Sequence, residues 1–523
     1  FVSPSGQQVA VDGFWDGGRT WRLRFSPDEE GEWRFRARLS DGVEQEGQFV
    51  CGPAEGETPF QRHGHVRVHE GRKRLEHAAG TPFFWLVDTA WNGPLRSDEA
   101  AWQWYAEQRV RQGFSGVQWV TTQWRAAPDG DANGDCAFVG DSRIEVRPEF
   151  FQRLDGKVEV QAAGLFCVPV LLWANQAGDP GQALTEDQAV LLARYMVARW
   201  AAFPVLGILP GDSNYWGQKA PRWHRIGSRV FGHARHAPVA LHCCGTHLPT
   251  EEFHDEKWCA VLGYQSGHGD TDQVIEWLVT GPPATDWQTE SRLLQLNMEP
   301  AYEAHLSYQS KQPHSAHSVR RACWPSPLNA PTAGVSYGGN GVWGWDDGTS
   351  HPVDHANAGV PLPWQEAVRM EAAEQLAHMR ALFDGLQWWR LRPCPQLLAK
   401  QPGELDITRF VSIASSPEAD LIMAYLPFGG ALTLHAEHLP ATSRSSRFFD
   451  PRTGNTVGGG YARGGGRHDH GDCAGGGRGL SLVAGSLRPT ERVPTRRWNT
   501  NNSSAPSVWR TYSWPSVRRP RGK

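Results

Sequence analysis

The sequence predicts an α/β protein in which a (β/α)8 barrel, also called a TIM barrel, is flanked by small N-terminal and C-terminal β-sandwich domains. Between residues 65 and 390, short apolar runs alternate with helix-forming stretches, which is typical of repeated βα units. Both flanks instead show strand patterns interrupted by turn residues. A chain of 523 residues is also too long for one hydrophobic core, so we expect several domains.

Residues 1–58 are predicted to form the N-terminal β-sandwich domain. Residues 21–25 and 33–39 alternate apolar and basic side chains with period two, and a turn-forming segment joins them. Two strands that each have one solvated face indicate an antiparallel hairpin. Because the chain begins at Phe1 inside strand-forming sequence, we expect a domain truncated at its start, and a missing signal peptide says nothing about export.

Eight candidate strands lie between residues 65 and 390, the predicted limits of the barrel domain. They are Phe83–Val87, Gly116–Val120, Leu165–Leu172, Val205–Leu209, Val239–His242, Val261–Gln265, Leu293–Asn297 and Gly334–Tyr337. The helices expected between and after them are Glu99–Gln112, Phe150–Ala163, Thr185–Ala202, Arg222–His233, Thr271–Val279 and Trp364–Phe383. Eight strands are the number that closes a barrel of this class.

Residues 394–457 are predicted to form an incomplete C-terminal β domain, with short strands near 413–416, 421–426 and 431–434. From 458 to 523, glycine triplets mixed with Arg and His give way to Pro, Ser and Arg. We predict a low-complexity tail there, either disordered or produced by a shifted reading frame. A nucleic-acid-binding tail is an alternative, but its arginines have few aromatic neighbours.

The amino-acid composition restricts the classes of molecule that the protein is expected to bind. A net charge of −4 with 21% charged residues provides no overall attraction to nucleic acid or to an anionic membrane. No apolar run reaches the roughly 18 residues of a membrane-spanning helix. The 25 tryptophans favour a carbohydrate partner, because exposed indole rings stack on sugar rings. Composition leaves the oligomeric state undefined.

No cofactor or bound metal is expected. The nine cysteines are scattered, which fits neither a disulfide framework nor a zinc ribbon. His242, Cys243, Cys244 and His247 could be interpreted as metal ligands. Adjacent cysteines rarely bind one tetrahedral ion well, so we do not predict a metal site there.

Polar and aromatic side chains gather where the predicted strands end, which is the edge of a barrel that faces a substrate. The candidate substrate-binding residues are Asp88, Trp91, Gln118, Trp173, Asn175, His242, Gln265, His268, Tyr302, Tyr337 and Trp343. Carboxylates and amides bind sugar hydroxyls, and aromatic faces hold sugar rings, so the set favours a carbohydrate site. Taken singly, Asp88 could instead cap a loop, Trp173 could belong to the core and His268 could be structural.

Two carboxylates across the barrel mouth could hydrolyse a glycosidic bond, a reaction that needs one protonated and one ionised carboxyl group. Asp212 ends the fourth predicted strand, and Glu299 follows the seventh. Counting by twos through 294–299 places Glu299 on the polar face, which we expect to be the inner one. We predict Asp212 as the acid/base and Glu299 as the nucleophile. The rival carboxylates are Asp88, Glu303 and Asp346.

Five segments carry a resemblance to a known family: 82–91, 211–212, 265–268, 299–303 and 337–343. In these segments the chain resembles the apiosidase-like glycoside hydrolases, which act on plant cell-wall glycans. Over roughly residues 65–390, the resemblance implies a TIM barrel and hydrolysis of O-glycosides, with Asp212 and Glu299 as the catalytic pair. It also implies a pectin-type substrate, such as one with apiose side chains, and a secreted or periplasmic location.

The flanks share this resemblance. Residues 12–18 are similar to the N-terminal β domain often fused to the family, and residues 450–454 to its C-terminal β domain, sometimes labelled collagen-binding-like. One departure is that the family tends to have His-Pro after the fifth strand, where this chain has His242 and Cys243.

Two alternatives remain open. The first is a carbohydrate-binding barrel without activity, although the retained carboxylates argue against it. The second is a metal-dependent hydrolase that uses His242, His247, His268 and Asp212.

Overall fold

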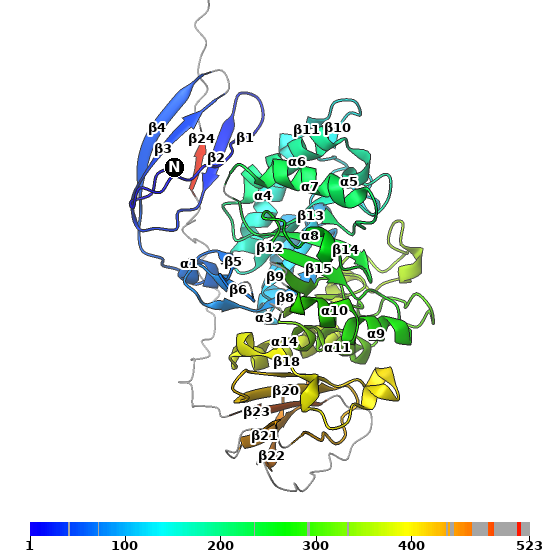
Figure 1. Ribbon diagram of the computed structural model, residues 1–523. Helices are drawn as coiled ribbons and strands as arrows, with labels where there is room; N and C mark the ends of the chain where they lie inside the picture. Colours follow the sequence, from blue (N-terminus) through cyan, green and yellow to red (C-terminus); the bar gives the residue numbers. More distant parts are fainter. Residues whose placement is uncertain are drawn as a thin grey trace, which may run out of the picture.

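The computed structural model describes residues 1–39, 42–71, 73–234, 236–289, 293–331, 334–435, 438–439, 444–462, 480–485 and 510–513. A closed barrel of parallel strands lies between two smaller groups of strands, as Figure 1 shows. The order around the barrel is β12-β13-β14-β15-β16-β17-β8-β9. The predicted (β/α)8 barrel is therefore confirmed.

All eight predicted barrel strands are present, with ends that differ by a few residues. They are β8 (Trp85–Thr89), β9 (Gly116–Val120), β12 (Phe166–Trp173), β13 (Gly207–Gly211), β14 (Val239–Gly245), β15 (Val261–Gln265), β16 (Leu294–Asn297) and β17 (Gly334–Gly338). Nearly every residue in them is buried. Strands that are covered on both faces need apolar side chains on both, which explains the short apolar runs.

Helices cover the outside of the barrel (Figure 1). The longer ones are α3 (Glu99–Arg111), α4 (Pro148–Ala162), α6 (Glu186–Trp200), α7 (Lys219–Phe231), α9 (Asp272–Val279), α11 (Ala316–Cys323) and α14 (Glu371–Asp384). The single helix predicted over 364–383 is instead two, α13 (Trp364–Ala367) and α14, because Met370 between them has an extended backbone. Helix α11 was not predicted.

The N-terminal strands form two small sheets. Strand β2 (Trp21–Phe25) pairs with β1 (Phe14–Trp15) and β24 (Arg510–Ser513), and β3 (Gly31–Arg38) pairs with β4 (Glu44–Cys51). The predicted hairpin of β2 with β3 is therefore wrong. Strand β3 pairs with β4 along its whole length, and alternating Arg and Glu side chains face each other across that pair.

The connection into the barrel is a short helix followed by a small sheet. Helix α1 (Pro59–His63) precedes the antiparallel strands β5 (Val66–Val68), β6 (Leu75–His77) and β7 (Pro82–Phe83). The first predicted barrel strand began at Phe83, but Phe83 ends β7, and β8 starts two residues later.

The C-terminal part is a six-stranded sheet in the order β18-β19-β20-β23-β21-β22. Its strands are β18 (Arg392–Pro393), β19 (Ser412–Ser415), β20 (Leu421–Leu426), β21 (Arg444–Phe449), β22 (Thr456–Ala462) and β23 (Leu480–Gly485). The strand predicted at 431–434 is only an isolated bridge from Leu434 to Leu398. The end of β22, β23 and β24 lie within the stretch predicted as a low-complexity tail; the rest of that stretch lies outside the described residues.

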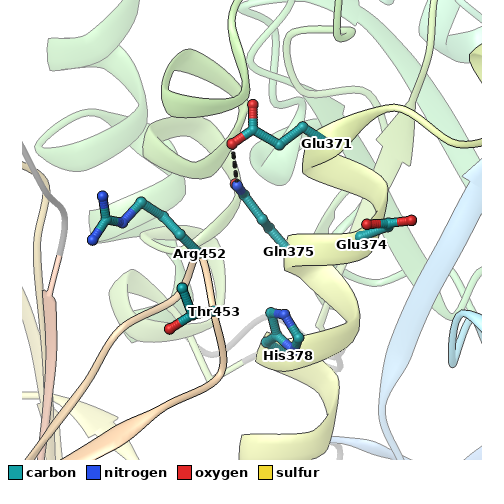
Figure 2. A pocket seen from close by; sticks show the side chains of 6 residues that line it. All are labelled: Glu371, Glu374, Gln375, His378, Arg452 and Thr453. Atoms are coloured by element: carbon teal, nitrogen blue, oxygen red, sulfur yellow. Dashed lines mark hydrogen bonds between the residues drawn. The ribbon is translucent and has the colours of Figure 1, made fainter.

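The C-terminal sheet packs against the barrel helices, among them α12 (Ser326–Asn329) and, through the turn after β21, α14. A hollow of about 470 Å³ lies there, between one face of α14 and the turn that joins β21 to β22 (Figure 2). Its lining residues are Glu371, Glu374, Gln375, His378, Arg452 and Thr453. Gln375 donates to Glu371 at 2.6 Å, so part of its polar lining is already paired.

Most of the tryptophans in the described residues lie in the hydrophobic core, so their large number has a structural explanation. Among those in the described residues, only Trp21 and Trp216 are exposed, by 44% and 60%. The excess of tryptophan is therefore not by itself a sign of carbohydrate binding.

No helix within the described ranges has both the length and the apolar character needed to cross a bilayer.

Candidate active site

The two predicted carboxylates share one histidine neighbour at the mouth of the barrel. Asp212 follows the last residue of β13, and Glu299 lies two residues after β16. The backbone N–H of Asp212 donates to His242 Nδ1 at 3.1 Å, and His242 Nε2 lies 3.4 Å from Glu299 Oε2. His242 comes from β14, so three strands position this group.

Glu299 lies at the mouth, but the alternation of side chains along β16 does not explain its position there. Asn297 donates to Ser326 of α12 (Ser326–Asn329) at 3.1 Å, outside the barrel, so the polar face of β16 is the outer one. The expectation of a polar inner face is therefore wrong. Gly263 pairs with His242 on one neighbouring strand and with Leu296 on the other. The side chains of Leu296 and His242 therefore point to the same, inner face of the barrel. Regular pairing ends at Asn297, and the alternation no longer holds at Glu299.

Two neutral histidines point their Nε2 atoms at Glu299. His268 donates to Glu299 Oε1 at 3.0 Å, and its Nδ1 accepts from the backbone N–H of Tyr302 at 3.3 Å. In both histidines a backbone N–H occupies Nδ1, so the proton resides on Nε2. Burial lowers the pKa of His242 to about 4 and that of His268 to about 3, which keeps both neutral. The hydrogen bond from His268 favours the ionised form of Glu299, and the Nε2 of His242 lies close by without a hydrogen-bond partner of its own.

The side chains around Asp212 differ from those around Glu299. Gln265 donates to its Oδ1 at 2.7 Å, Asn175 donates to Oδ2 at 2.6 Å, and Arg125 Nη2 lies 3.4 Å from Oδ2. Burial, followed by the charge of Glu299, raises the pKa of Asp212 to about 7, although Arg125 acts in the opposite direction. Burial also raises the pKa of Glu299, and His242 and Arg125 counter it. An acidic group with a pKa near neutrality can supply a proton.

Aromatic rings line the mouth beside His242. Trp91 lies 5.1 Å from Trp173 and 5.5 Å from the His242 ring, measured between centroids, and Trp124 packs 4.6 Å from Trp173. On the Glu299 side, the Tyr302 ring packs 4.5 Å from His268. The predicted residues among these are therefore brought together around the carboxylates, and Trp124 joins them.

Asp88 and Tyr337 face away from the mouth, so their prediction as substrate-binding residues is wrong. They are paired neighbours on β8 and β17 and share the outer face of the barrel. Arg109 Nε of α3 donates to Asp88 Oδ2 at 2.5 Å, and both side chains are fully buried. The Tyr337 hydroxyl donates to Glu303 Oε2 at 2.8 Å.

Gln118 and Trp343 lie behind the mouth. Gln118 is fully buried, and its amide donates to the Met298 carbonyl at 2.7 Å and to Thr89 Oγ1 at 2.9 Å. Trp343 is 2% exposed and packs 4.8 Å from the ring of His355. In this structure both residues support the wall of the mouth without offering surface to a ligand.

The rival carboxylates lie elsewhere. Glu303 accepts from the backbone N–H of Ala372 at 2.9 and 3.0 Å and so holds the first turn of α14. Asp346 lies on the loop after β17, and burial raises its pKa to about 7 without contact to Asp212 or Glu299.

The sequence predictions missed Arg125, His305, Tyr308 and His355. Arg125 directly follows Trp124 in the loop after β9, and no regular pattern in that loop indicated its position. His305 stacks on His268 at 4.3 Å, and Tyr308 lies 5.6 Å from the same ring. Nothing in the sequence indicated those contacts, because a long irregular loop brings the rings together.

The alternative metal site does not form. Across the part of the chain that the structure describes, no three His, Cys, Asp or Glu side chains are arranged to hold a metal ion. His247 instead packs 4.6 Å from Trp216, ring to ring.

Known families match both the barrel and the N-terminal strands. The family model described as apiosidase-like, catalytic domain, matches residues 69–390, which is more than half of the chain. A model of a domain of unknown function, DUF5060, matches residues 1–40. A comparison with curated proteins gave no match.

Solved structures share the fold. A glycoside hydrolase family 5 protein from Bacteroides vulgatus ATCC 8482 has a TM-score of 0.71 and 17% identity, over 82% of this chain and 95% of that one. A second structure, described as a glycoside hydrolase, has a TM-score of 0.69 and 20% identity, over 82% and 98%. At these identities the likeness shows the fold, and the family follows from the match over residues 69–390. The chain thus belongs to the apiosidase-like family and is a glycoside hydrolase.

Proposed function

We propose that the enzyme cleaves O-glycosidic bonds in plant cell-wall glycans of the pectin type, with apiose-bearing side chains as the first candidates. Asp212 serves as the acid/base and Glu299 as the nucleophile. The observation that carries this proposal is the contrast between the two carboxyl groups. A raised pKa of about 7 suits Asp212 to hold a proton, and the hydrogen bond from His268 suits Glu299 to stay ionised.

The reaction would proceed in two steps. A carboxylate oxygen of Glu299 attacks the anomeric carbon while the bond to the leaving oxygen breaks, and Asp212 gives its proton to that oxygen. The resulting glycosyl ester on Glu299 is then attacked by water, whose proton passes to the Asp212 carboxylate. Water adds across the original bond, and both side chains return to their starting states.

The surrounding residues would hold the sugar and the reacting groups. Trp91 and Trp173 are buried beside His242 and support the apolar wall of the mouth. Asn175 and Gln265 keep Asp212 directed into the mouth, and each can exchange that contact for a sugar hydroxyl. His242 and His268 orient Glu299.

Replacing Asp212 by asparagine is expected to lower kcat/KM on a cleaved pectic glycan by about a hundredfold or more, because no proton reaches the leaving oxygen. Release of monosaccharides from pectic fractions, followed by chromatography, measures this. Asp346→Asn is the matched control, since Asp346 also has a pKa near 7 but lies away from the pair. Equal activity in Asp212→Asn and wild type would refute the assignment. Tight glycan binding without any cleavage by the wild type would favour the non-catalytic alternative.

The pH dependence of kcat/KM is expected to be bell-shaped. Activity falls as the pH rises through about 7, because Asp212 loses the proton that it must donate, and it falls in acid once Glu299 becomes protonated. Arg125→Met removes a positive charge that lowers the pKa of Asp212, so the alkaline limb should move to higher pH. An unmoved limb in this variant would contradict the role given to Arg125.

A further inference from the structure

An exposed tryptophan lies on the same loop as Asp212. Trp216 is in the connection from β13 to α7, four residues after Asp212, and 60% of its surface is exposed. Its carbonyl accepts from the backbone N–H of Lys219 at 3.3 Å, which fixes the loop to the start of α7. Single exposed hydrophobic residues are common, so exposure alone would carry no argument.

The ring of Trp216 is held on a column of aromatic side chains that rises from the core. Phe253 and Tyr215 are buried and pack 4.9 Å apart, and Tyr215 stacks on His247 at 5.9 Å. His247 then contacts Trp216 at 4.6 Å. A ring fixed in this way loses little conformational freedom when it binds a ligand, which is the usual property of a built binding surface.

A polar atom under the same ring lacks a partner. His247 is 9% exposed, and its Nε2 has no hydrogen-bond partner among the described residues. That nitrogen is itself buried out of reach of a ligand, so the role of the His247 ring here is to support the indole ring of Trp216. Burial lowers the pKa of His247, so its ring packs under Trp216 in the neutral form.

We infer that Trp216, supported by His247, binds a further sugar residue on the leaving-group side of the scissile bond. This inference rests on the proposed function, since Asp212 protonates the leaving oxygen and Trp216 belongs to the same loop. The indole face packs against the apolar face of a sugar ring. The substrate is thus an oligosaccharide or polysaccharide in which at least one sugar follows the bond that is cut.

The test compares two substrates in the Trp216→Ala variant. One is the pectic oligosaccharide that the wild type cleaves; the other is the glycosyl fluoride of the sugar released, whose leaving group does not reach Trp216. We expect KM for the oligosaccharide to rise about tenfold, with kcat/KM for the fluoride unchanged and with Trp216→Phe close to wild type. Trp21→Ala is the control, because Trp21 is also exposed but lies on β2.

Three outcomes would overturn the inference: an unchanged KM for the oligosaccharide, an equal loss on both substrates, or the same effect from Trp21→Ala. The proposed function has a separate test, because wild-type protein that releases no sugar would refute it. Calorimetric titration of pectic oligosaccharides into Glu299→Gln protein, with and without Trp216→Ala, then still decides the role of Trp216. Equal affinities, or no binding to either protein, would overturn the inference.

Discussion

Glu299→Gln is expected to lower kcat/KM on a cleavable glycan by about a thousandfold or more and to leave the fold intact. Glutamine has almost the same shape as glutamate, so the contacts with His242 and His268 can persist in altered form. An amide oxygen, however, does not attack the anomeric carbon. Steady-state rates of sugar release measure the loss, and circular dichroism spectra verify the fold.

Chemical rescue separates a lost nucleophile from a damaged site. Azide added to a Glu299→Gly variant should restore turnover and give a glycosyl azide, because the small anion enters the space that the carboxylate left. Mass spectrometry of the product detects it. Full activity in Glu299→Gln would contradict the nucleophile assignment. The two roles would be exchanged if the glycosyl azide of inverted anomeric configuration formed with an Asp212→Gly variant and the one of retained configuration formed with Glu299→Gly.

Asp88→Ala is expected to destabilise the protein by roughly 3–5 kcal/mol, because it leaves the guanidinium of Arg109 buried without its carboxylate. Both side chains are fully buried, and the two groups are 2.5 Å apart. The Tyr105 hydroxyl also donates to Asp88, so a second buried polar group loses its partner. The urea midpoint of unfolding, followed by circular dichroism, measures the change.

The same helix provides a control for this prediction. Glu107 and Arg111 of α3 form a pair at 3.9 Å with both side chains about half exposed, so Glu107→Gln should change stability by less than about 0.5 kcal/mol. Equal midpoints for Asp88→Ala and wild type would contradict the structural role of Asp88. A loss of sugar release without loss of stability would return Asp88 to the substrate-binding set.

Local sequence patterns predicted the barrel well because a strand covered on both faces must be apolar throughout. The run that became Phe166–Trp173 is an example. The same rule does not predict the direction of a polar side chain in such a strand. Asn297 faces outward because Ser326 lies there to accept its hydrogen bond, and Asp88 faces outward because Arg109 lies there to donate one to its carboxylate. Those partners come from helices whose positions no local pattern contains.

The candidate pair was predictable from strand ends, but its surroundings were not. Asp212 and Glu299 each follow a strand, and parallel strands in a closed barrel end on one side. Arg125 lies 3.4 Å from Asp212 although 87 residues separate them, and its loop has no regular pattern to locate it. At the C-terminal end, β23 inserts between β20 and β21, an order that sequence alone gives no means to assign.

The contact between Glu303 and α14 sets the smallest length at which the enzyme could work alone. Glu303 lies four residues after Glu299, and both of its carboxylate oxygens accept from the first turn of α14. A shortened enzyme that stopped after β17 would have all eight strands but would lose this anchor of the loop that carries Glu299, the proposed nucleophile. A catalytic unit that keeps this anchor must therefore extend at least into α14, beyond the closure of the barrel itself.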